Sequence, residues 1–89
     1  MGNILSIFTY QKTIQEGIPL IKEWIETKRN EFEENDDFIQ LIRIINEIEE
    51  EKDYSKDSFD DIRFVLRPFE YLPLKIKRIF NIGRMVFPE

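Results

Sequence analysis

The sequence predicts a mainly α-helical domain of three or four helices with an N-terminal arm. Two observations lead to this fold class: apolar residues recur at helical spacing in several segments, and start and stop residues separate those segments. The 89 residues are 42% hydrophobic and 35% charged, which is a globular composition with room for one small core. We therefore expect a single domain, 1–89, with an apolar arm over 1–17, two amphipathic helices within 18–52 and a basic helical region over 58–83.

The arm and the first helix are divided by Pro19. Residues 1–17 hold a short, partly β-branched apolar run, which predicts a strand or an irregular arm packed on the core. Proline suits the first position of a helix, so the first helix is predicted over 18–34.

The second helix is predicted over 37–52, with Asn35 or Asp36 as its N-cap. Its apolar residues recur every three or four positions, and Ile39 and Ile44 widen that stripe beyond what one packed face needs. We expect this helix to be central, and an exposed apolar face on it would favour a homodimer.

The third helix is predicted to start at Ser58, after a polar loop over 53–58, and to break or kink at Pro68. Pro73 can start a fourth helix, with Gly83 just past its end and residues 84–89 as an extended tail. The alternative is an α+β fold, in which residues 3–10, 62–67 and 84–87 pair as a small sheet. β-Branched and aromatic residues dominate the second of those segments.

The predicted core follows from these stripes. Its members are Ile21, Trp24, Ile25, Phe32, Phe38, Leu41, Ile42, Ile45, Ile48, Ile62, Val65, Leu66, Phe69, Ile76, Ile79 and Phe80.

The residue types argue against an enzyme. The chain has no His and no Cys, which removes histidine general bases, cysteine nucleophiles and the usual zinc ligands. Asp53, Ser55 and Asp57 match the start of a calcium loop, but Ser58 and Phe64 stand where that loop needs Gly and Glu. We predict no catalytic residue, no metal site and no cofactor.

A nuclease-like pattern is the other candidate chemistry. Asp36 with Glu50 and Lys52 loosely matches the carboxylates and lysine of metal-dependent nucleases, but the strand that would hold the pair is missing. These residues are better explained as solvated helix ends.

Charge is sorted along the chain. Residues 1–30 have a net charge of +1, residues 31–61 of −10 and residues 62–88 of +5. Either the acidic middle folds against the basic end, where each exposed ion pair contributes about 0–1 kcal/mol, or the excess charge serves a partner.

The partner hypothesis predicts a non-enzymatic interaction protein that binds a basic protein surface and inhibits or regulates it. Fifteen Ile against no Ala indicate AT-rich coding, as in small viruses, phages and low-GC microbes, so a viral product that blocks a host factor is one concrete form. The acidic partner-binding residues would be Glu31, Glu33, Glu34, Asp36, Asp37, Glu47, Glu50 and Glu51.

The alternative function is a membrane-associated adaptor. Met1-Gly2-Asn3-Ile4-Leu5-Ser6 satisfies the N-myristoylation pattern, with acylation at Gly2, and a basic patch is the usual second membrane signal. This combination resembles small myristoylated viral proteins, including retroviral matrix domains, over those six residues and the basic C-terminal region. The acidic middle departs from that family. The basic residues that could contact a membrane are Arg63, Arg67, Lys75, Lys77, Arg78 and Arg84.

Nucleic acid could also attract those basic side chains, with nearby aromatic rings for stacking. The net charge of −5 argues against such binding. An intracellular location is expected, with membrane association only under the alternative function.

Overall fold

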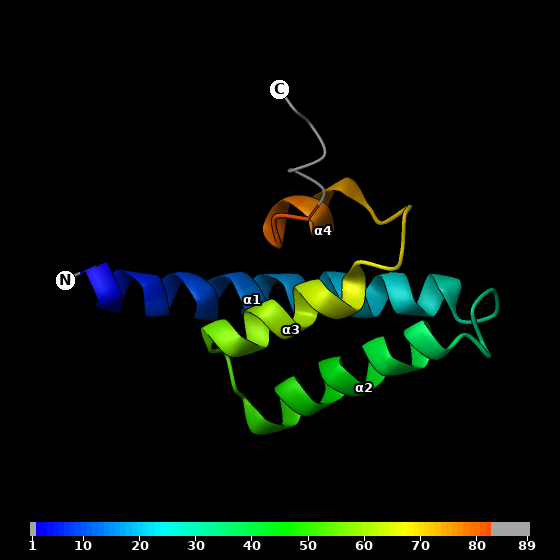
Figure 1. Ribbon diagram of the computed structural model, residues 1–89, viewed down its shortest axis with the longest axis horizontal. Helices are drawn as coiled ribbons and strands as arrows, with labels where there is room; N and C mark the ends of the chain where they lie inside the picture. The colour runs from blue at the N-terminus through cyan, green and yellow to red at the C-terminus, as the bar shows by residue number, and fades with distance from the viewer. Residues whose placement is uncertain (1, 83–89) are drawn as a thin grey trace.

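The computed structural model describes residues 2–82, with side chains from Tyr10 onward (Figure 1). Within that range the chain forms four helices and no strand: α1 (Gly2–Lys28), α2 (Asp36–Glu51), α3 (Lys56–Leu66) and α4 (Leu74–Ile79). The mainly helical prediction is confirmed. The alternative sheet is wrong, because 3–10 lies within α1 and 62–66 within α3; its third segment, 84–87, lies outside the described residues.

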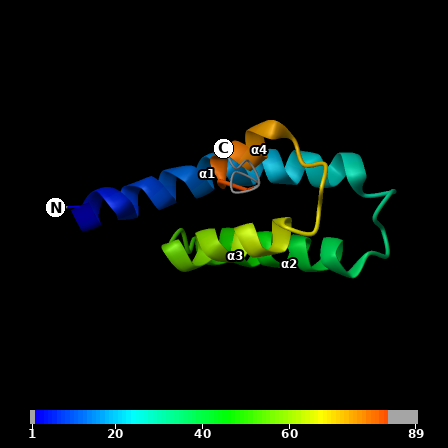
Figure 2. The ribbon, with the colours of Figure 1, turned by 45° about the horizontal axis from the view of Figure 1, so that its top comes forward.

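The helices form two layers, with α1 and α4 in one and α2 and α3 in the other (Figure 2). α3 packs against both α2 and α1, while α4 packs on α1. The N-terminal turns of α1 project past the other helices in both views. The long α1 is therefore the central helix against which both α3 and α4 pack.

The predicted N-terminal arm is present as the first part of α1, which projects past the other helices. Its predicted conformation, a strand or an irregular segment, and the predicted helix start at residue 18 are wrong, because α1 is helical from Gly2. One buried stripe runs through Gly17 and Pro19 without a break, formed by Ile14, Ile18, Ile21 and Ile25. Burying that stripe outweighs the roughly 3 kcal/mol that an interior proline costs a helix. α1 also ends at Lys28, six residues before the predicted end, and the chain turns over 29–34.

Side-chain caps fix the starts of α2 and α3. Asn35 caps α2 by accepting a hydrogen bond from the Phe38 amide at 2.9 Å, as predicted. Ser55, not Ser58, caps α3: its hydroxyl accepts from the Ser58 amide at 3.3 Å. Starting three residues early carries Ser58 inside the helix, where its side chain is buried.

Left-handed residues end α2 and α4. Lys52 and Asn81 have φ of 53° and 57°. The next amides turn back to earlier carbonyls, Asp53 to Ile48 at 3.2 Å and Ile82 to Lys77 at 2.8 Å, the pattern of a Schellman motif. Asn81, rather than the predicted Gly83, therefore makes the turn after α4.

The core matches most of the predicted set. Phe32, Ile42 and Ile79 are the exceptions, since they are half-buried at its edge. Three core residues were not predicted. Ile14 lies in the supposed arm, Ile18 is the first residue of the predicted first helix, and Leu72 lies between Pro68 and Pro73.

Four aromatic rings close one end of the core. Trp24, Phe32, Phe38 and Phe69 all pair with one another, at ring-centroid distances from 5.3 to 6.4 Å. They come from α1, the α1–α2 turn, α2 and the segment between α3 and α4. This aromatic cluster thus joins the two layers where the acidic stretch of the chain begins.

Candidate functional site

The first group of predicted acidic residues lies where α1 turns into α2, and we call it the corner cluster: Glu31, Glu33, Glu34, Asp36 and Asp37. All five are exposed. Within residues 10–82, only Glu31 forms an ion pair, with Lys28 at 3.4 Å. The Asn35 cap holds this turn in place, and Asp36 and Asp37 occupy the first turn of α2, where the helix dipole favours negative charge.

The second group occupies the last two turns of α2, and we call it the end cluster: Glu47, Glu50 and Glu51. All three are exposed, and none forms an ion pair within the side chains that the structure describes. Glu49, their neighbour, instead faces α1 and contacts Lys22 at 2.9 Å. The last turn of α2 contains no basic residue, so these carboxylates stand at the negative end of the helix dipole, where they are unfavourable.

The two clusters are not brought together. They stand at opposite ends of α2. At the helical rise of 1.5 Å per residue, about 15 Å separates Asp37 from Glu47 and about 22 Å separates Asp36 from Glu51. The fold therefore offers two acidic patches joined by one rigid rod.

The predicted basic residues that the structure describes divide between half-buried and exposed positions. Arg63 is half-buried and donates to the Asn81 carbonyl at 3.4 Å, which links the end of α3 to the end of α4. Arg67, Lys75 and Arg78 are exposed, and Lys77 is half-buried. Gly2 is the first residue of α1, and Arg84 lies outside the described residues.

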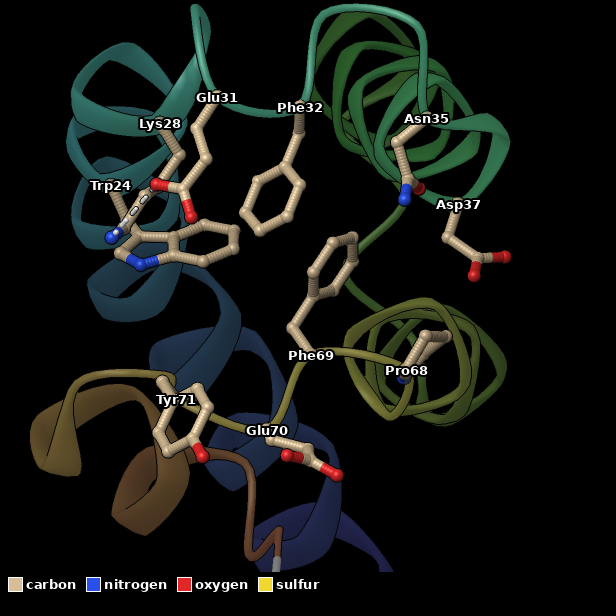
Figure 3. Close-up of a pocket in the computed structure, with 10 residues that line it drawn as sticks. All are labelled: Trp24, Lys28, Glu31, Phe32, Asn35, Asp37, Pro68, Phe69, Glu70 and Tyr71. Carbon is tan, nitrogen blue, oxygen red and sulfur yellow. Dashed lines mark hydrogen bonds and ion pairs between the residues drawn. The ribbon is translucent and has the colours of Figure 1, made fainter.

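A pocket of about 360 Å³ opens beside the corner cluster (Figure 3). Three rings of the aromatic cluster line it: the Phe32 and Phe69 rings point toward each other, and the Trp24 indole lies next to them. Its polar lining consists of Lys28, Glu31, Asn35, Asp37 and Glu70, with Tyr71 and Pro68 completing the wall. The pocket thus combines an aromatic floor with three carboxylates and one ammonium.

Sequence reasoning missed this pocket. Its walls come from the end of α1, the start of α2 and residues 68–71, and the last of these lie more than thirty positions after the other two along the chain. Glu70 and Tyr71 show no periodic pattern that would mark them. The one usable signal is that Trp24, Phe32 and Phe69, all predicted core residues, flank predicted helix ends.

Among the described side chains, ion pairing perturbs the carboxylate Glu26. A hydrogen bond from Arg29, reinforced by the guanidinium charge, lowers the pKa of Glu26 and raises that of Arg29. The contact between the Arg29 guanidinium and the Glu26 carboxylate is 2.6 Å long, and both side chains are exposed. This ion pair stabilises the C-terminal end of α1. It supplies no group suited to catalysis.

Two further features bear on function. No group of three or more acidic side chains within the described part of the chain is arranged to hold a metal ion. None of the helices found within residues 2–82 has the length and hydropathy that a membrane span requires.

Comparisons with known protein families, with curated proteins and with solved structures find no match to this chain.

Proposed function

We propose that this protein is a non-enzymatic interaction protein that binds a basic surface of another protein and thereby inhibits or regulates it. The observation that carries the proposal is the state of the eight predicted carboxylates. All eight are exposed, and within residues 10–82 only Glu31 has a cationic partner. The competing explanation, in which the acidic middle folds against the basic end, would require ion pairs between those two regions. The described side chains form none of that kind.

The end cluster supports the proposal most directly. Glu50 and Glu51 oppose the dipole of their own helix and have no compensating contact among the described residues. Residues whose charge or conformation is unfavourable where they stand, with no compensating stabilisation, are concentrated at functional sites. Asp36 and Asp37 favour their helix and can be explained by stability alone.

The spacing of the clusters indicates how a partner would be held. Even the shortest separation along α2, about 15 Å, exceeds the screening length of about 10 Å at 0.1 M salt, so each cluster acts on the nearest part of a partner independently. A basic protein that spans α2 would be contacted at two points. Such contacts raise the association rate and select the orientation of the partner.

The proposal is tested with charge-reversed baits. The unchanged protein and a variant with Lys at Glu33, Glu34, Asp36 and Asp37 are used to capture partners from the native host at two salt concentrations. The purified partner is then titrated against both. We expect a partner with a basic surface, bound tightly only by the unchanged protein and released by salt.

A second variant controls for net charge. It places Lys at four exposed acids outside both clusters: Glu16, Glu23, Asp57 and Asp61. This variant should retain most of the binding. An affinity for the partner that changes neither with the charge reversal nor with the salt concentration would contradict the proposal. A virus- or phage-encoded inhibitor of a host factor is the form that the composition favours.

The membrane alternative, with Gly2 acylated and the basic C-terminal region on the lipid surface, stays a prediction. The intact mass of the protein from a eukaryotic host tests it. A retained Met1 or an unmodified Gly2 amine would argue against acylation.

A further inference from the structure

We infer that the pocket beside the corner cluster receives an arginine side chain from the partner's basic surface. This inference rests on the proposed function and deepens it, because it names the residue type that anchors the complex. Aromatic rings and carboxylates, the two groups that a guanidinium recognises, both line this pocket. In Figure 3 the Glu31 carboxylate lies beside Trp24, and those of Asp37 and Glu70 point away from the rings.

The aromatic floor suits a flat cation. A guanidinium stacks on aromatic rings and is more weakly hydrated than an ammonium, so it loses less on entering an apolar hollow. Phe32 is half-buried and presents its ring to the pocket, while Trp24 and Phe69 are almost fully buried and hold the floor in shape. Their mutual contacts, at 5.3 to 6.4 Å, keep the floor rigid before any ligand arrives.

The carboxylates give the pocket lining a net negative charge. Glu31, Asp37 and Glu70 line it against the single ammonium of Lys28, which leaves an excess of two negative charges. Lys28 already contacts Glu31 at 3.4 Å, while Asp37 and Glu70 form no ion pair among the described side chains. A guanidinium donates hydrogen bonds in several directions within one plane, so it can lie on a ring and still reach a carboxylate, which a point-charge ammonium cannot do.

The size of the pocket is also suitable. A volume of about 360 Å³ lies at the lower end of the roughly 300–1,000 Å³ of ligand sites. A second hollow of equal volume lies between α1 and α4, but it holds one Glu and one Lys and so has no excess of either charge. Buried anchors of this kind, most often Trp, Tyr or Arg, carry much of the affinity at protein interfaces.

A labelled peptide of alternating arginine and glycine is the probe, compared with its lysine and citrulline counterparts. Citrulline keeps the shape of arginine and removes the charge. Binding is followed by fluorescence anisotropy and by the emission of Trp24, the only tryptophan in the chain. We expect the arginine peptide to bind at least about threefold more tightly than the lysine peptide and to shift the Trp24 emission.

Paired variants locate the site. Asp37→Asn with Glu70→Gln removes two pocket charges, and Glu47→Gln with Glu50→Gln removes two from the end cluster. We expect the first pair of substitutions to lower the affinity for the arginine peptide about fivefold or more. The second pair should lower it by less than about twofold. Equal losses from both pairs would overturn the pocket inference while leaving the proposed function intact. Salt-independent binding, unaffected by either pair, would overturn both.

A ring variant tests the floor without changing charge. Phe32→Leu keeps an apolar side chain of similar size but removes the aromatic ring. We expect it to lower the affinity for the arginine peptide at least about threefold. Phe64→Leu is the matched control, since Phe64 is 71% exposed on α3 and outside the pocket. Circular dichroism confirms that each variant is folded at the assay temperature. Equal affinity of the two leucine variants would overturn the stacking role.

Discussion

Gly17 occupies the middle of α1 because the Phe80 ring lies directly on its backbone. A Cβ atom built on Gly17 would overlap the edge of that ring, and Ile79 leaves only 3.3 Å on another side. Phe80 is fully buried, so it has little room to move. Glycine normally weakens a helix by about 1 kcal/mol relative to alanine, and here it permits the close approach of α4 to α1.

We therefore expect Gly17→Ala to destabilise the protein by about 1–2 kcal/mol, because overpacking outweighs the gain in helix propensity. Urea unfolding measures the change. Glu16→Ala, an exposed neighbour on α1, is the control and should change stability by no more than about 0.5 kcal/mol. In a Phe80→Leu background the cost of Gly17→Ala should shrink. An increase in stability for Gly17→Ala alone would contradict the packing described here.

Glu26 gives a second prediction at the scale of one residue. Its hydrogen bond from Arg29 lowers its pKa, so the folded state binds this proton less readily than the unfolded state. The small stabilisation is present at neutral pH and is lost as the pH falls through the lowered pKa. Carboxyl-resolved NMR titration should find the pKa of Glu26 below its ordinary value, and Arg29→Gln should return it there. An unchanged titration in Arg29→Gln would rule out this cause.

The two ends of α2 should respond in opposite directions to the same change of charge. Glu50→Lys replaces an acid at the negative end of the helix dipole, and we expect a gain in stability of about 0.3–1 kcal/mol. Asp36→Lys makes the same replacement at the positive end and should lose a similar amount. Thermal unfolding at low salt measures both. Changes of the same sign in the two variants would show that the dipole does not govern these positions.

Helix boundaries show what the sequence could and could not predict. The Asn35 cap and the stripe of α2 follow from local rules and were predictable. The continuity of α1 was not, because Gly17 and Pro19 are both breakers in isolation. Gly17 is explained only by Phe80, more than sixty residues later. The exposure of the acidic clusters was predictable from their density, whereas the pocket depends on residues 68–71 folding back onto the α1–α2 turn.

For the molecule as a whole, the aromatic cluster should control cooperativity. Phe69→Ala removes a buried ring that contacts Trp24, Phe32 and Phe38, and should cost about 3–5 kcal/mol. Phe64→Ala, five residues earlier but 71% exposed, is the control and should cost no more than about 0.5 kcal/mol. Urea unfolding is followed by Trp24 fluorescence and by circular dichroism, and the two transitions should coincide in the unchanged protein. Similar losses for both alanine variants would contradict this assignment of the core.

The short length of α4 and its few contacts with the rest of the fold affect how readily it opens. This six-residue helix packs on α1, with Ile76 and Phe80, the residue that follows the helix, buried. Two contacts join this region to α3: the hydrogen bond of Arg63 to the Asn81 carbonyl, and the Phe59 and Phe80 rings, whose centroids lie 5.6 Å apart. So short an element opens at low free energy, and its amides should exchange with deuterium before those of α2 and α3. Because residues 68–71 connect α3 to α4, such partial opening would loosen one wall of the aromatic hollow, and an occupant of that hollow would slow the exchange.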